Sequence, residues 1–309
     1  MTLTGFFRYF ASALQWGSFY ALIAIGYSMV YGVLMLYNFA HGDIFMAGSY
    51  IGLFLCGALL AISAGGLISM PAWLILILTI VGAMIGTSIV GVLVERLAYK
   101  PLRNAPRASA AVTGMMLGLL METANLWGLG AERRNFPSLI ETTVYNIGGV
   151  SITNTKIMVV GVALAVMYIL HLFVHRTKVG LAMRGCAYDF PIVPLMGVPM
   201  DFIASATFVL GSSAAAIAGV LFCISYPVLE PYMGMLIGWK AFIAAILGGR
   251  GSIIGAVFGG YLLGFIEIFV AAIFPSTLRD LIAYSIALLI LTFRPLGFFG
   301  EPYSAQLRL

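Results

Sequence analysis

Residues 9–36, YFASALQWGSFYALIAIGYSMVYGVLML, run without a single charged side chain. An α-helix needs about 20 apolar residues to cross a bilayer, so this segment is long enough to span one. It also far exceeds the apolar core of about 7–15 residues in a secretory signal peptide, although Arg8 precedes it. We therefore expect a membrane segment that the mature protein retains.

The whole chain has the same apolar character. Of its 309 residues, 62% are apolar and 9% are charged, whereas a soluble domain has about 45–50% and about 25%. This composition excludes a water-soluble protein. The 36 glycines fit closely packed membrane helices, so the composition predicts an all-α polytopic membrane protein embedded in a lipid bilayer.

Apolar stretches that could each cross the membrane recur along the chain. They predict eight or nine transmembrane helices in a single transmembrane domain over residues 1–309. Segment 9–36 is too long for one straight crossing and segment 235–247 is too short, so the sequence leaves open a broken or re-entrant helix at either place. The candidate segments are 9–36, 44–63, 71–94, 108–130, 157–175, 203–226, 235–247, 253–274 and 281–293.

The basic residues predict the orientation of these helices. The net charge is +5, but the sixteen Lys and Arg residues are scattered singly between apolar runs, which argues against nucleic-acid binding. They are densest in the loops at about 95–107 and 176–202, which we expect to be cytoplasmic because short cytoplasmic loops carry the excess of positive charge. With nine crossings, the N-terminus and the loop 131–156 then lie outside, although that loop carries Arg133 and Arg134.

The sequence offers little support for catalysis or for a metal site. It has no Walker A motif, so this chain is not expected to hydrolyse ATP. His171 and His175 share a helix face but have no third ligand nearby in sequence. The three cysteines, Cys56, Cys186 and Cys223, are too few and too scattered for a disulfide framework and are expected to be free thiols. We predict no catalytic residue, no metal and no cofactor in this chain.

Polar residues at membrane depth are costly and therefore count as candidates for function. They are Asn38, His41 and Asp43 between two apolar runs, then Glu122, Lys240 and Glu267. Asp43 has two interpretations: its carboxylate caps the following helix, or the turn lies inside the bilayer and exposes a helix end to a substrate. For Lys240 and Glu267 the alternatives are mutual pairing, interfacial pairing with Lys240 extended outward to the membrane surface, and a role in transport.

Glycines repeat every four residues at Gly251, Gly255 and Gly259. This spacing places bare backbone on one helix face and predicts close helix packing.

Several stretches resemble the permease subunits of bacterial branched-chain amino acid ABC importers, of the LivH type. The matches follow the same order along nearly the whole chain, and the NFAHGD turn at 38–43 is the most distinctive of them. They include GSFYALIAIGY at 17–27, ERLAYKPLR at 95–103, GLAMR at 180–184, LMGV at 195–198, KAF at 240–242, LGG at 247–249 and RPLG at 294–297.

The resemblance implies an importer of the bacterial inner membrane that works by alternating access. Its partners would be a second permease subunit, two cytoplasmic ABC ATPases that use ATP, and a periplasmic substrate-binding protein. Because they are polar residues at membrane depth, we expect Asn38, His41 and Asp43 to line the substrate pathway, with less weight on Glu122 and Glu267. By resemblance, the loop after Arg176 is where such permeases contact their ATPases. Within this loop we expect the contact at Arg184, Asp189, Leu195, Met196 and Gly197.

The sequence departs from that family at the predicted ATPase contact. Asp189 is followed by Pro191 and Pro194, and two prolines three residues apart disfavour a regular helix. Two alternatives to the amino acid importer stay open: an ABC permease for urea or short amides, and a standalone secondary transporter coupled to ions through the buried carboxylates. The solute and the identity of the second permease are not determined by the sequence.

Overall fold

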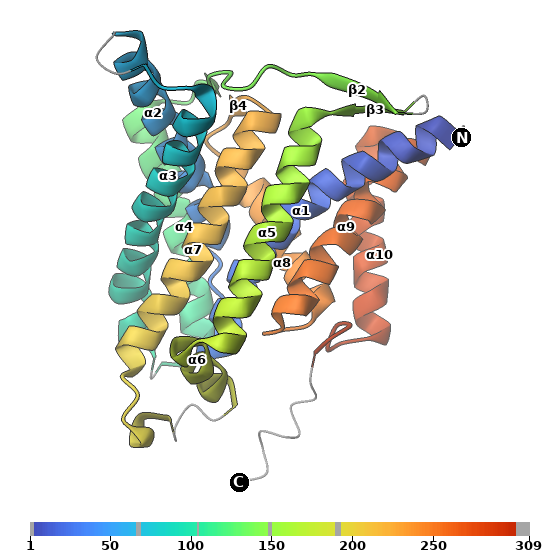
Figure 1. Cartoon of the computed structure of the whole chain (residues 1–309). Coiled ribbons are helices and arrows are strands. Elements are labelled where there is room, and N and C mark those ends of the chain that lie inside the picture. Colours follow the sequence, from blue (N-terminus) through green and yellow to red (C-terminus); the bar gives the residue numbers. More distant parts are fainter. Residues whose placement is uncertain (1–2, 66–68, 104, 148–149, 189–192, 301–309) are drawn as a thin grey trace. The chain divides into compact units, whose positions relative to one another are not determined.

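A computed structural model of the chain describes residues 3–65, 69–103, 105–147, 150–188 and 193–300 (Figure 1). The chain folds into two compact units, each built from separate stretches of sequence. Unit 1 comprises Met1–Met35, Thr142–Ile203 and Lys240–Leu309, and unit 2 comprises Leu36–Glu141 and Ala204–Trp239.

Unit 1 is built around its first helix. Residues 17–30 of α1 are all buried, and α1 packs along α9 and against α5 and α6 (Figure 1). The helices of unit 1 are α1 (Leu3–Leu34), α5 (Asn154–Arg176), α6 (Lys178–Tyr188), the part of α8 (Met233–Gly248) from Lys240 onward, α9 (Ile253–Ile273) and α10 (Arg279–Phe293), with short 3₁₀ turns at Val193–Met196 and Ser276–Leu278.

The long loop before α5 forms a hairpin that the sequence did not predict. Strand β2 (Val144–Ile147) pairs antiparallel with β3 (Val150–Thr153), with Val144 opposite Thr153. β3 leads directly into α5 and contacts α1.

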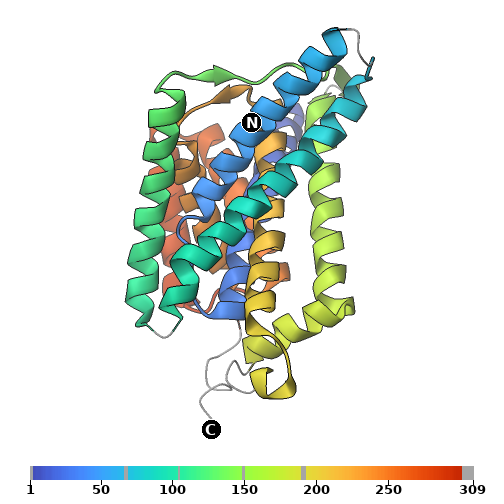
Figure 2. The same cartoon turned by 90° about the vertical axis from the view of Figure 1, so that its left-hand side faces the viewer.

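Unit 2 contains the helical pair α2 and α3, which lie side by side (Figure 2). α3 continues through a π-helical turn at Glu95–Tyr99 and a 3₁₀ turn at Lys100–Leu102. The other elements are α2 (His41–Ala64), α3 (Ala72–Val94), α4 (Arg107–Leu129), α7 (Met200–Ser225) from Ala204 onward, the first turns of α8, and the strand pair β1 (Arg134–Asn135) and β4 (Val228–Leu229).

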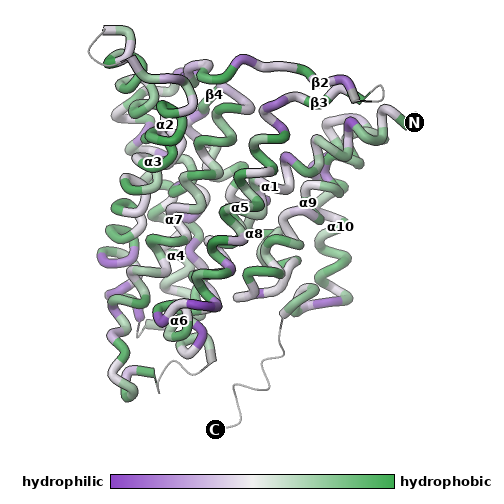
Figure 3. Tube along the Cα trace, in the orientation of Figure 1, coloured by the Kyte–Doolittle hydropathy of each residue, from purple (hydrophilic) through white to green (hydrophobic). Residues whose placement is uncertain are grey.

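A helix is present at each of the nine predicted spans, so the prediction of an all-α polytopic membrane protein is confirmed. Seven helical segments of the described chain are long and apolar enough to cross a bilayer. α8 has only 16 residues, and α4, which has 23 residues, is not among the seven. The tube in Figure 3 is mostly hydrophobic along the long helices, whereas the short helix α6 carries hydrophilic residues.

The structure decides one alternative that the sequence left open and corrects one interpretation. Segment 9–36 does not contain a broken helix: α1 is one continuous helix of 32 residues that runs through Gly26 and Gly32, because close packing along α9 outweighs the low helix propensity of glycine. Gly251 does not share a helix face with Gly255 and Gly259. It lies before α9 with φ +80°, a backbone conformation that favours glycine.

Candidate functional site

The turn between α1 and α2 places the predicted pathway residue Asn38 in a buried position. Its side-chain Oδ1 accepts a hydrogen bond from the Tyr99 hydroxyl, at 3.0 Å. Its backbone carbonyl accepts from the N–H of His41, the first residue of α2, at 3.1 Å. The His41 side chain is also buried, so the turn is fixed by hydrogen bonds within unit 2.

One interpretation of the sequence made Asp43 the cap of the following helix. The structure contradicts this interpretation. The N-cap residue is Ala40, and no side chain caps this end. Asp43 lies in the first turn, where the partial positive charge of the helix N-terminus favours a carboxylate. Only 5% of Asp43 is exposed, and its Oδ1 atom has no hydrogen-bond partner.

The structure brings Asp43 together with Glu122, the predicted pathway residue on α4. The Asp43 carboxyl lies against Gly118, one turn before Glu122 on α4, and the two carboxyl groups face each other. Glu122, which is 3% exposed, also faces the backbone N–H of Met235 in the first turn of α8. Asp43 and Glu122, which are far apart in the sequence, therefore form one buried acidic site.

Glycines on α4 and α8 make room for the Asp43 carboxylate. A Cβ at Gly118 would clash with Asp43 Oδ2, and one at Gly234 would lie 2.6 Å from Asp43 Oδ1. One turn before Gly118, a Cβ at Gly114 would clash with the Tyr99 hydroxyl. Gly114, Gly118 and Glu122 are spaced by four residues, so one face of α4 accommodates first the Tyr99 hydroxyl and then the Asp43 carboxylate.

Glu267, the remaining predicted pathway residue, belongs to unit 1, as does the Lys240 side chain with which it pairs. Of the alternatives that the sequence left open for Lys240 and Glu267, the structure shows mutual pairing. Arg279 lies 3.2 Å from Glu267, Lys240 lies 2.9 Å from Asp280, and the Tyr20 hydroxyl donates to Glu267 Oε2.

The region predicted to contact the ATPases presents exposed apolar side chains. Leu195 is 85% exposed and Met196 is 77% exposed. Both lie in the 3₁₀ turn that precedes Gly197, which has φ +79°. Arg184 is exposed on α6, and Asp189 lies outside the described residues.

The helix α6 that carries Arg184 is fixed within unit 1 by its other face. Met183 and Cys186 are buried, and the Cys186 thiol lies 3.7 Å from the Met200 sulfur. Burial raises the pKa of the Cys186 thiol above its ordinary value, which disfavours the reactive thiolate.

Close helix packing occurs at two of the three predicted glycines. Gly255 contacts the backbone of Gly248, and Gly259 contacts Ala244, both on α8. Gly251, outside the helix, instead lies against Gly32 of α1. α9 also approaches α1 at Gly260, where a Cβ would clash with the backbone of Ala21.

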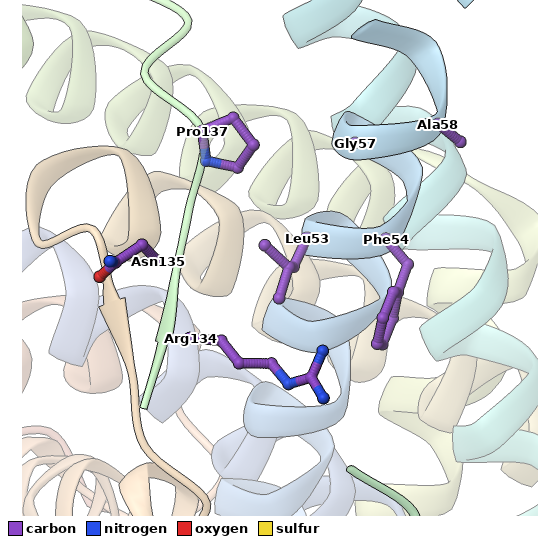
Figure 4. Close-up of a pocket in the computed structure, with 7 residues that line it drawn as sticks. All are labelled: Leu53, Phe54, Gly57, Ala58, Arg134, Asn135 and Pro137. Atoms are coloured by element: carbon purple, nitrogen blue, oxygen red, sulfur yellow. The ribbon is translucent and has the colours of Figure 1, made fainter. Parts of the chain in front are cut away.

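A shallow pocket of about 500 Å³ lies in unit 2, between α2 and the strand β1 (Figure 4). Its apolar side is the second half of α2, with Leu53 and Phe54, and its polar side is Arg134 and Asn135. The Arg134 guanidinium lies over the Phe54 ring at 5.9 Å and donates to the Leu129 carbonyl at 2.9 Å. The sequence analysis did not identify this pocket.

Among the residues that the structure describes, no group of three or more His, Cys, Asp or Glu side chains could hold a metal ion. The rings of His171 and His175 stack at 4.0 Å. The sequence analysis also missed Tyr20 and Tyr99, which bind the predicted residues Glu267 and Asn38. The only available signal was a tyrosine hydroxyl inside an apolar run, since a buried hydroxyl usually finds a partner.

Comparison with known proteins connects this fold to transport. A family model described as "Branched-chain amino acid transport system / permease component" matches residues 9–291. The high-affinity branched-chain amino acid transport system permease protein BraD of Pseudomonas aeruginosa is 39% identical over 295 residues, with 94% of each chain covered. The corresponding protein LivH of Escherichia coli K12 is 36% identical over 291 residues, which cover 93% of this chain and 92% of LivH. A probable branched-chain amino acid transport permease of Methanocaldococcus jannaschii is 26% identical over 265 residues, which cover 82% of this chain and 78% of that protein.

Proposed function

The chain belongs to the family of branched-chain amino acid transport system permease components, and from this membership we propose that it imports branched-chain or related amino acids as the membrane-spanning subunit of an ABC importer. The observation that carries the proposal is the match to BraD over 94% of both chains. Seven long apolar helices make it a multi-pass membrane protein, and we assign it to the bacterial inner membrane.

The energy for transport would come from other subunits. The sequence has no Walker A motif, so ATP would be used by two cytoplasmic ABC ATPases. A second permease subunit and a periplasmic substrate-binding protein would complete the importer. The chain itself needs no cofactor in this mechanism.

We place the substrate pathway in unit 2, at Asn38, His41 and Asp43, with Glu122 beside Asp43. Buried polar groups in membrane helices are maintained at an energetic cost, which supports a functional role for these four residues. A zwitterionic amino acid needs polar groups along its path, and these residues can supply both hydrogen bonds and negative charge. Glu267 is a weaker candidate, because Lys240 and Arg279 already neutralise it.

We place the ATPase contact at Arg184, Asp189 and the exposed turn Leu195–Gly197. Large apolar side chains exposed at the end of a loop typically mark a protein interface. Pro194 lies within this 3₁₀ turn, and so the contact would be made by a short turn in addition to the helix α6.

The first test is purification of the tagged chain from gently solubilised membranes of its host, followed by mass spectrometry. We expect a second permease and P-loop ATPases to copurify. The complex, reconstituted in liposomes with its binding protein, should take up labelled leucine, isoleucine or valine only when ATP is supplied. Recovery of the chain alone, with uptake that needs no ATP, would refute the proposal.

The site assignments have their own tests. Asp43→Ala should reduce uptake while membrane insertion stays intact, and normal uptake would remove Asp43 from the pathway. The double variant Leu195→Ser, Met196→Ser should lose copurifying ATPase. Leu97→Ser, an equally exposed leucine in the other predicted cytoplasmic loop, is the matched control and should retain it.

A further inference from the structure

Two acidic side chains in unit 2 are buried side by side. The Asp43 carboxyl lies against Gly118 of α4, one helical turn before Glu122, and faces the Glu122 carboxyl. Asp43 is 5% exposed and Glu122 is 3% exposed. One oxygen of each, Asp43 Oδ1 and Glu122 Oε1, is buried with no hydrogen-bond partner. Two ionised carboxylates in contact repel each other strongly when both are removed from water.

No basic side chain relieves this repulsion. Among the residues that the structure describes, neither carboxyl group forms an ion pair with Lys, Arg or His. The backbone of Gly118 and Gly234 encloses Asp43 so closely that not even a methyl group would fit there. The two carboxyl groups must therefore be balanced by the helix backbone or by a small ion.

The helix backbone balances about one of the two charges. Asp43 lies in the first turn of α2, and Glu122 faces the Met235 N–H in the first turn of α8. A helix N-terminus acts as about half a positive charge, so two of them together offset about one negative charge. The second negative charge would remain uncompensated in a buried site.

We propose that Asp43 and Glu122 share one bound proton, so that the chain carries a buried proton site with a net charge of −1. The proton supplies the hydrogen-bond donor that two carboxylates lack, because ionised carboxyl groups only accept. The site belongs to the pair and not to either residue alone. It joins α2 to α4 through a carboxyl–carboxylate hydrogen bond.

The other titratable groups near the pair do not supply this donor. On α2, His41 is two residues before Asp43 and therefore points to a different side of the helix. The Tyr99 hydroxyl, which lies against α4 at Gly114, one turn before Gly118, donates to Asn38. From α8 the pair meets Gly234 and the backbone of Met235, neither of which titrates.

Infrared spectroscopy of the full chain in lipid nanodiscs tests the proposal. At neutral pH we expect a C=O stretching band from a protonated carboxyl group that disappears in both Asp43→Asn and Glu122→Gln. In either variant a single carboxylate remains, and the two helix N-termini balance its charge. Glu141→Gln, which changes an exposed carboxylate, should leave the band unchanged.

Absence of this band from the unmodified chain, or its persistence in either variant, would overturn the proposal. The same samples distinguish a proton from a metal cation when thermal unfolding is compared in sodium, potassium and choline buffers. Stabilisation by one alkali cation that is lost in Glu122→Gln would mean that both carboxylates are ionised around that cation.

A stability comparison keeps the test valid if one variant folds poorly. Glu122→Gln retains a neutral hydrogen-bond donor beside Asp43 and should keep the unfolding temperature of the unmodified chain. Glu122→Ala removes the donor and should lower it. Equal unfolding temperatures for the two variants would contradict the proposal. None of these measurements requires transport, so their outcome is independent of the proposed function.

Discussion

Unit 1 and unit 2 each bury carboxylates within apolar helices, but they neutralise them differently. In unit 1, Glu267 lies between Lys240 and Arg279 and accepts from Tyr20. With Asp280 included, this cluster holds two positive and two negative charges. In unit 2, Asp43 and Glu122 each lie near a helix N-terminus, and their two carboxyl groups face each other. A buried acidic residue can therefore be balanced by side chains or by backbone and a proton.

The two solutions have different consequences. A side-chain ion cluster needs every member, because removal of one cation leaves a charge in a medium that solvates it poorly. A carboxyl pair can lose one ionisable group to a neutral amide and keep its hydrogen bond. We therefore expect the ion cluster in unit 1 to lose more stability on substitution than the carboxyl pair in unit 2. The variants below measure this difference.

The largest effect is expected from Lys240→Met. Loss of one partner from a buried ion pair costs about 3–5 kcal/mol, and Arg279 still faces Glu267, so we expect the free energy of unfolding to fall by about 3 kcal/mol. Unfolding by SDS in mixed micelles measures this change. Lys156→Met is the control in the same unit: its ammonium donates to the Ser12 hydroxyl, and its loss should cost only about 1 kcal/mol.

A second substitution verifies the cause of that loss. In the double variant Lys240→Met, Glu267→Leu no buried carboxylate is left behind, so much of the lost stability should return. If the double variant is less stable than Lys240→Met alone, Glu267 is not the source of the penalty, and the contrast between the two units fails.

The positions of the helices could be predicted from the sequence, because length and apolar composition alone determine which segments can span a bilayer. The pairing of Lys240 with Glu267 was one of the alternatives that the sequence left open, since opposite charges at membrane depth rarely remain apart. The continuity of α1 could not be predicted. Gly26 and Gly32 each disfavour a helix by about 1 kcal/mol, and only the packing against α9 shows that this cost is met.

The contact between Asp43 and Glu122 illustrates a second limit of sequence reasoning. Both residues were identified as candidates, yet nothing in a single sequence indicates which of several buried polar residues meet. Their contact depends on where Gly118 and Gly234 allow backbone to approach the Asp43 carboxylate. Each glycine alone looks like ordinary helix packing. The socket that Gly118 and Gly234 form around the Asp43 carboxylate therefore becomes visible only in three dimensions.

A smaller effect is expected from Gly118→Ala, which changes no charge. The added methyl group would displace the short Asp43 side chain from its socket. Overpacking costs about 1–3 kcal/mol and the better helix propensity of alanine returns about 1 kcal/mol, so a net loss of about 1 kcal/mol is expected. The same micelle unfolding measures it. In Gly82→Ala the added methyl meets only the flexible end of Leu55, and stability should hold or rise. A loss of stability in Gly82→Ala as large as in Gly118→Ala would show that the socket has no special role.

The smallest differences are expected from two tyrosines, one in each unit. Tyr20→Phe removes a hydrogen bond to the charged Glu267, which should cost about 1.5 kcal/mol. Tyr99→Phe removes a hydrogen bond to the neutral amide of Asn38, and hydrogen bonds between membrane helices average about 0.6 kcal/mol. Both substitutions keep the aromatic ring, so the difference in unfolding free energy isolates the charge of the acceptor. If Tyr99→Phe lowers the free energy of unfolding more than Tyr20→Phe does, then the hydrogen bond to Asn38 in unit 2 stabilises the protein more than the one to the ion cluster of unit 1. The expected order of sensitivity of the two units would then be reversed.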